Sequence, residues 1–167
     1  MALFARTTVE TVDFYSEMDP DVTVREVPVD ENDPKKGTKK LKDIADGASR
    51  FKIGPLDVFL MAHIYDNASK LSGKQGSEEV GIETRMNATN IDAVRFGLRG
   101  LPDGFRNRQG QEIKYEVEKR SVNGREYTAV KDSVIDTLGL RLIAEMAEAI
   151  KELSEVSADE EKNSASA

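Results

Sequence analysis

Hydrophobic and polar positions alternate along some parts of the chain and repeat at helical spacing along others. Val22–Val29, VTVREVPV, alternates between apolar and polar residues, which predicts a β-strand. Pro28 has no amide donor, so we expect an edge strand or one that ends there. The charged stretch Asp30–Gly47 predicts a long flexible loop. Arg50–Ile53 then resumes the extended pattern and could pair antiparallel with the first strand.

A first helix is predicted over Pro55–Lys70. Proline is tolerated in a first helical turn, and Asp57 suits the positive end of the helix dipole. The apolar residues of this segment recur at helical spacing and form a broad face: Leu56, Val58, Phe59, Leu60, Met61, Ile64 and Leu71. The glycine-containing stretch Ser72–Gly81 predicts a linker.

A second helix is expected to start near three residues whose side chains suit an N-cap: Asn87, Thr89 and Asn90. Its apolar residues follow at three- and four-residue steps and predict one buried stripe: Ile91, Val94, Leu98 and Leu101. Gly97 lies inside this helix, where glycine costs about 1 kcal/mol relative to alanine. A close approach by another helix would offset that cost. The proline and glycines of 102–110 end the helix and form a loop.

The last third of the chain predicts a hairpin followed by a helix. Apolar residues alternate from Ile113 to Val117, and Asn123-Gly124 is a strong signal for a hairpin turn, with Arg125–Val130 as the returning strand. A helical pattern starts at Asp132 or Ser133 and is interrupted by Gly139. One apolar face then continues to about Val156 through Leu140, Ile143, Ala147, Ile150 and Leu153.

Together these elements predict an α+β fold. We expect a single small domain over residues 21–156, with three main helices and short N-terminal and central antiparallel β-segments. Residues 1–20 show no sustained period and are expected to form a flexible N-terminal arm. Residues 157–167, SADEEKNSASA, have no apolar residue larger than alanine and are expected to form a disordered acidic tail.

Composition narrows the range of functions. The 167 residues suffice for one domain with a modest core, since 38% are hydrophobic and 33% are charged. The sequence contains no run of about 18 apolar residues, so no membrane span is predicted. The acidic N-terminal segment does not resemble a secretory signal. The absence of cysteine excludes disulfides and thiolate metal sites and fits a reducing cytosol.

Candidate catalytic, metal and cofactor sites are weak. His63 is the only histidine and lies at the edge of an apolar helix face, as expected for a residue without a catalytic role. Asp66 shares its face, but two ligands do not make a metal site. The loop SGKQGS lacks the full phosphate-binding pattern. We therefore expect no enzyme, no metal and no cofactor.

Two groups of residues have the composition of binding surfaces. Five lysines fall within KKGTKKLK: Lys35, Lys36, Lys39, Lys40 and Lys42. They form either a solvated loop or a docking patch for an acidic partner or nucleic acid, although the net charge of −7 and the lack of aromatic residues disfavour nucleic acid. Four arginines surround two phenylalanines in the second group: Arg95, Arg99, Arg106 and Arg108 with Phe96 and Phe105. These phenylalanines belong either to the core or to a protein-recognition patch.

The second group lies in DAVRFGLRGLPDGFRNRQGQEIKY, Asp92–Tyr115, which resembles a recurring stretch of the tail assembly chaperones of long-tailed bacteriophages. The order of elements over Val22–Val156 is similar too: an extended segment, a long helix beginning near a proline, a glycine-rich helix and loop, and an acidic-apolar last helix. The resemblance implies a non-catalytic protein that coats the aggregation-prone tape measure protein before the tail tube polymerises around it. Other tail proteins and a second copy of the chain are further possible partners, in the host cytoplasm and not at a membrane.

On this hypothesis six residues form the partner-binding surface: Arg95, Phe96, Arg99, Leu101, Phe105 and Arg106. Two other functions remain open. A structural protein of the virion, such as a tail tube, tail completion or head–tail joining protein, would need long strands or an inserting arm. A small nucleic-acid-binding regulator would use the lysine segment and would bind less tightly as salt rises.

Overall fold

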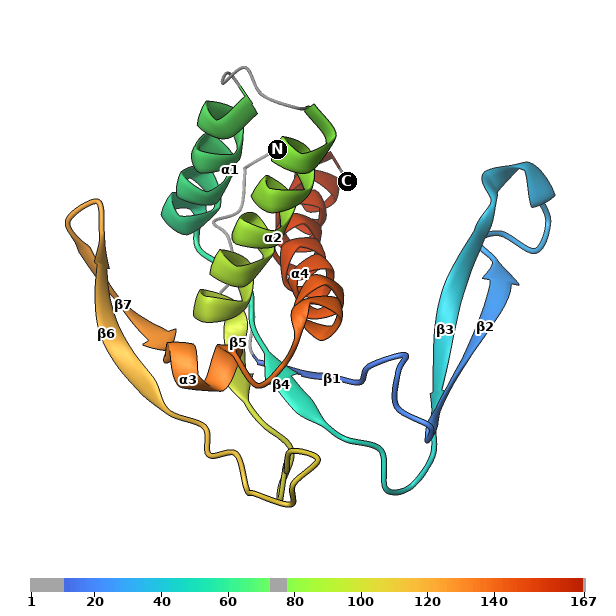
Figure 1. Cartoon of the computed structure of the whole chain (residues 1–167). Coiled ribbons are helices and arrows are strands. Elements are labelled where there is room, and N and C mark those ends of the chain that lie inside the picture. The colour runs from blue at the N-terminus through green and yellow to red at the C-terminus, as the bar shows by residue number, and fades with distance from the viewer. Residues whose placement is uncertain (1–10, 73–77, 167) are drawn as a thin grey trace.

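Helices α1 (Val58–Ser72), α2 (Glu78–Gly97) and α4 (Leu140–Ser166) lie side by side and form the body of the protein (Figure 1). This computed structural model describes residues 11–72 and 78–166, with side chains except those of 68–72, 78–85 and 156–166. The remaining elements are β1 (Val12–Phe14), β2 (Val22–Pro28), the 3-10 turn Pro34–Lys36, β3 (Thr38–Ile44), β4 (Phe51–Ile53), β5 (Leu98–Gly100), β6 (Val117–Val122), β7 (Arg125–Val130) and α3 (Asp132–Ile135). The mixture of helices and antiparallel strands confirms the predicted α+β class.

A small antiparallel sheet in the order β1-β4-β5 closes one end of the helical body. In β4, Phe51 and Ile53 are buried while Lys52 between them is exposed, because successive side chains of a strand point to opposite faces. Phe51 meets the rings of Phe14 and Phe105 edge to face, at centroid distances of 6.4 and 5.4 Å. The inner face of the sheet is therefore part of the core.

The apolar stripe of α4 supplies the other side of this core. Four of its residues are buried at three- and four-residue steps: Ile143, Met146, Ala147 and Ile150. This confirms the predicted face except at its first residue, Leu140, whose surface is 55% exposed. The helix extends to Ser166, past the expected end at Val156, but its described side chains stop at Glu155. Disorder of 157–167 therefore stays a prediction.

α2 and α4 approach each other closely at Gly97. A Cβ atom added to this glycine would lie 2.6 Å from Cδ1 and 2.7 Å from Cγ2 of Ile150, well inside van der Waals contact. Another helix therefore does approach closely at this glycine. No other residue fits here without displacing Ile150, so the packing of α2 on α4 offsets the low helix propensity of glycine.

The hairpin β6–β7 matches its prediction at the turn. Asn123 and Gly124 have φ values of +50° and +80°, the left-handed conformations of a type I′ turn. The strands pair in register from Val117 with Val130 to Val122 with Arg125. The first strand begins at Val117, later than the alternation from Ile113 predicted.

The prediction of a flexible loop over Asp30–Gly47 is wrong. Thr38–Ile44 forms β3, which pairs with all seven residues of β2 and makes an arm that projects from the helical body (Figure 1). Apolar and polar residues do not alternate here, because both faces of β3 remain largely exposed. β2 does end at Pro28, as its missing amide donor predicted.

The N-terminal segment and the partner of β4 also differ from expectation. Val12–Phe14 forms β1, so the predicted flexible arm over 1–20 is wrong for these residues, while 1–10 lie outside the described part. β4 pairs with β1 and β5, not with β2. Three-residue strands carry too little alternation for their partners to be inferred from sequence.

Helices α1 and α2 are displaced from their predicted bounds. α1 begins at Val58, because the side chain of Asp57 accepts a hydrogen bond of 2.8 Å from the amide of Leu60 and thereby caps the helix.

α2 begins at Glu78, so Asn87–Asn90 lie inside it rather than at its N-cap. It ends at Gly97, where the chain enters β5. Leu98 is buried, but it belongs to this strand and not to the helix. Of the predicted linker, residues 73–77 lie outside the described part.

We predict that Gly97→Ala lowers the free energy of unfolding by about 1–3 kcal/mol, because the new methyl group overlaps Ile150. Helix propensity alone predicts the opposite sign, since alanine is favoured over glycine by about 1 kcal/mol. Urea unfolding distinguishes the two effects.

Gly100→Ala is the matched control, because a Cβ there would lie 3.5 Å from the side chain of Lys52, an ordinary contact. Adding Ile150→Val to Gly97→Ala should recover part of the loss. A Gly97→Ala variant as stable as the wild type would show that the close approach does not constrain the fold.

Candidate binding surface

The six predicted binding residues fall into two groups in the structure. Arg95 and Phe96 lie at the end of α2 and are turned toward the interior. The other four lie on β5 and the following loop, and we call them the loop face: Arg99, Leu101, Phe105 and Arg106. The predicted residues therefore do not form one continuous surface.

Arg95 is occupied by contacts within the protein. Its side chain is 12% exposed, and its guanidinium pairs with the carboxylate of Asp132 and lies 3.8 Å from that of Asp92. The Asp132 carboxylate also lies 3.5 Å from Arg120. Arg95 thus joins α2 to α3, and Asp132 joins α3 to β6. Its hydrogen bond and charge lower the pKa of Asp132, whereas burial raises the pKa of Asp92.

Phe96 belongs to the core. It is 6% exposed and meets the ring of Tyr127 edge to face at 5.9 Å. The hydroxyl of Tyr127 in turn reaches the carboxylate of Asp57 at 3.3 Å. Phe96 therefore holds the hairpin β6–β7 against the helices and offers little surface to a partner.

The loop face combines cationic and apolar side chains at the surface. Arg99 is exposed and donates to the carbonyl of Pro55 at 3.2 Å, and Arg106 is exposed and donates to that of Gly110 at 2.9 Å. Leu101 and Phe105 are half-buried and pack against the core. Each retains an exposed part, and a segment that presents both arginine and apolar surface suits protein recognition.

Side-chain hydrogen bonds fix the loop that carries this face. Oδ1 of Asn107 accepts from the amides of Gln109 and Gln111, at 3.0 and 2.9 Å. The hydroxyl of Tyr115 donates to the carbonyl of Leu98 at 2.9 Å, which ties the end of the loop back to β5. The loop is therefore preorganised, so a partner need not supply the free energy to order it.

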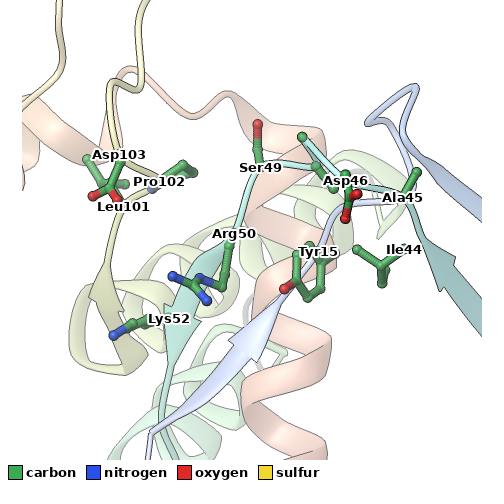
Figure 2. A pocket seen from close by; sticks show the side chains of 12 residues that line it. Tyr15, Ile44, Ala45, Asp46, Ser49, Arg50, Lys52, Leu101, Pro102 and Asp103 are labelled. Atoms are coloured by element: carbon green, nitrogen blue, oxygen red, sulfur yellow. The ribbon is translucent and has the colours of Figure 1, made fainter.

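A pocket of about 540 Å³ opens beside the loop face. Figure 2 shows it between the β4 segment that carries Arg50 and Lys52, the loop Leu101–Asp103, and the turn that carries Asp46. Its charges have both signs, which suits a polar protein surface better than an apolar ligand. Sequence reasoning missed Arg50 and Lys52, although their alternation with the buried residues of β4 placed them on the outer face.

Several lysines of the predicted basic segment have acidic neighbours. Their amino groups lie 3.4 to 3.6 Å from carboxylates, in the pairs Lys36–Asp30, Lys40–Glu17 and Lys42–Glu145. Lys42 also donates to the carbonyl of Tyr15 at 2.5 Å and lies 4.6 Å from the ring centre of Phe14. These contacts reduce the cationic field that a nucleic-acid backbone requires.

Glu145 of α4 anchors the β2–β3 arm. Its carboxylate accepts hydrogen bonds from the buried hydroxyl of Ser16 at 2.7 Å and from the amide of Glu17 at 2.6 Å. Lys42 reaches the same carboxylate from β3. This acidic side chain thus contributes to the position of the arm relative to the helices, together with the contacts of Lys42 to Tyr15 and Phe14.

The described side chains contain no group of three or more histidine, cysteine, aspartate or glutamate residues arranged to hold a metal ion. No helix in the described part of the chain combines the length and apolar character that a membrane crossing needs. Comparison of the chain with family models, curated proteins and solved structures finds no match. Any assignment of function therefore depends on the residues and their geometry.

We predict that Asp132→Asn lowers the melting temperature at about pH 7. The pKa of Asp132 is lower in the folded protein than its ordinary value, so its carboxylate stabilises the fold above the usual aspartate range. That stabilisation is lost as the pH falls through the folded-state pKa. The difference in melting temperature between the variant and the wild type should therefore shrink as the pH approaches about 3. Asp136→Asn, at an exposed aspartate four residues later, is the control, and a difference independent of pH would contradict the prediction.

We predict that Glu145→Ala loosens the β2–β3 arm. Loss of the carboxylate leaves the buried hydroxyl of Ser16 without its partner, at a cost of about 1–3 kcal/mol. Hydrogen exchange should accelerate in Ser16–Ile44 more than in α1 or α2. Glu148→Ala, at an exposed position on the same helix, controls for the loss of an acidic side chain. Equal exchange in both variants would show that Glu145 does not hold the arm.

Proposed function

We propose that this chain is a non-catalytic tail assembly chaperone of a long-tailed bacteriophage, which binds the tape measure protein in the host cytoplasm and keeps it from aggregating. The observation that carries the proposal is the preorganised loop face at the centre of the stretch that resembles those chaperones. There, Arg99 and Arg106 flank the half-buried Leu101 and Phe105.

The residues of that stretch have definite structural roles. Gly97 permits the packing of α2 on α4, Leu98 fills the core from β5, and Tyr115 closes the loop. The resemblance thus involves residues that determine this fold as well as residues at its surface.

Charge and exposed surface fit the chaperone role. A net charge of −7 makes complexes coated with this protein repel one another, which opposes aggregation. The loop face meanwhile offers apolar surface and arginines that can contact the apolar and acidic side chains of a helical partner. No bond is made or broken in this role, so positioning and shielding suffice.

A permanent structural role in the virion is the second candidate, and the β2–β3 arm favours it. The arm consists of two seven-residue strands that project from the body, and an isolated two-stranded hairpin is only marginally stable in water. Insertion between neighbouring subunits would cover it. The paired lysines of the 3-10 turn and β3, in contrast, give little support to the nucleic-acid regulator.

The test is co-expression with the tape measure protein, recognisable as the long helical product of a neighbouring gene, followed by affinity capture. We expect a soluble complex that Arg99→Glu combined with Arg106→Glu weakens by about tenfold or more. Lys119→Glu, an exposed charge reversal on β6, is the matched control. Mass spectrometry should find the chain absent from purified virions.

Circular dichroism of each variant verifies that the fold is retained. Failure of the wild-type chain to capture or solubilise the tape measure protein would refute the chaperone proposal. Stoichiometric amounts of the chain in mature particles would favour the structural role instead, with the loop face as an assembly contact.

A further inference from the structure

The outer face of α1 carries large apolar side chains. Val58 is 61% exposed, Phe59 is 53% exposed and Tyr65 is 44% exposed, with the exposed Ala62 between them. The opposite face of the same helix packs into the core through Leu60 and Ile64. A helix that is apolar on both sides is normally covered on both sides.

The positions of these residues on α1 form a regular pattern. Successive residues of an α-helix are about 100° apart and rise by about 1.5 Å. Ala62 marks the centre of the face. Val58 and Tyr65 therefore lie along one flank of the face, at its two opposite ends. Phe59 and Asp66 lie along the other flank, also at opposite ends.

We propose that α1 packs antiparallel against α1 of a second copy of this chain, about a two-fold axis beside Ala62. A two-fold axis perpendicular to the helices makes the two copies of α1 run in opposite directions, so the N-terminal end of one lies beside the C-terminal end of the other. Each flank of the face then meets the same flank of the second copy. Val58 then lies opposite Tyr65 of the second copy, and Phe59 lies opposite its Asp66. Alanine at the centre lets the helices approach closely.

Charge complementarity identifies the occupant as a second copy. The guanidinium of Arg125, on β7, lies 3.5 Å from the centre of the Phe59 ring, at the N-terminal end of the face. The exposed carboxylate of Asp66 lies at the other end. In the antiparallel pair each Arg125 meets Asp66 of the other copy, so symmetry forms this ion pair twice. A partner helix of different sequence would have to supply both charges by coincidence.

This inference concerns the purified chain and does not rest on the proposed function. Sedimentation equilibrium should show a mass that rises from monomer toward dimer with concentration. Ala62→Glu places two carboxylates at the axis and should abolish the dimer. A wild-type chain that stays monomeric at the highest attainable concentration would refute the proposal.

A charge exchange tests the antiparallel register. Asp66→Arg alone and Arg125→Asp alone should each weaken dimerisation by about tenfold or more, because each places like charges together. The double variant should return to within about threefold of the wild type, because the ion pair forms with its charges exchanged. Asp103→Arg, an exposed reversal on the loop after β5, should leave the dimer unchanged. Failure of the double variant to recover would reject this arrangement.

A single introduced cysteine gives a direct geometric readout, because the natural chain has none. In Ala62→Cys the two thiols lie beside the axis, so mild oxidation should yield a disulfide-linked dimer. Ser121→Cys, on the exposed surface of β6, is the control and should cross-link much more slowly. If Ala62→Glu abolished capture of the tape measure protein by a chain that is monomeric throughout, the face would belong to that partner and the dimer would be excluded.

Discussion

The close packing of Gly97 against Ile150 is the contact on which the arrangement of the body depends. It brings α2 onto α4 at the point where α2 ends, and the next residue, Leu98, enters the small sheet as β5. β5 then pairs with β4, which fixes Arg99 within the strand and the start of the loop that carries Leu101. A larger side chain at Gly97 would therefore disturb the helix packing, the sheet edge and the loop face together.

Sequence reasoning succeeded where a physical constraint is local or strongly periodic. The apolar stripe of α4 repeats over several turns, and the Asn123-Gly124 turn has a specific backbone requirement. Reasoning failed at β3, because a strand exposed on both faces carries no alternation. It also failed at β1 and at the start of α2, because short strands choose partners through the tertiary fold and polar helices are stabilised by neighbours rather than by their own pattern.

The candidate binding residues show the same division. Composition identified the arginines and phenylalanines near the end of α2, but it could not tell which of them point inward. Arg95 and Phe96 hold elements of the fold together, while Arg99 and Arg106 lie at the surface. Long-range partners such as Asp132 and Tyr127 make this distinction, and they come from segments more than 30 residues later in the chain. The function assigned to the exposed set remains a proposal.

The anchoring of the β2–β3 arm at Glu145 has a mechanical consequence. A force on the arm is transmitted to Glu145 of α4 through the contacts of Ser16, Glu17 and Lys42. Glu145 lies five residues before Ile150, a distance of about 7.5 Å along the helix axis. A force applied to the arm would thus act as a torque on α4 near its contact with Gly97, so displacement of the arm would strain the close packing of Gly97 on Ile150.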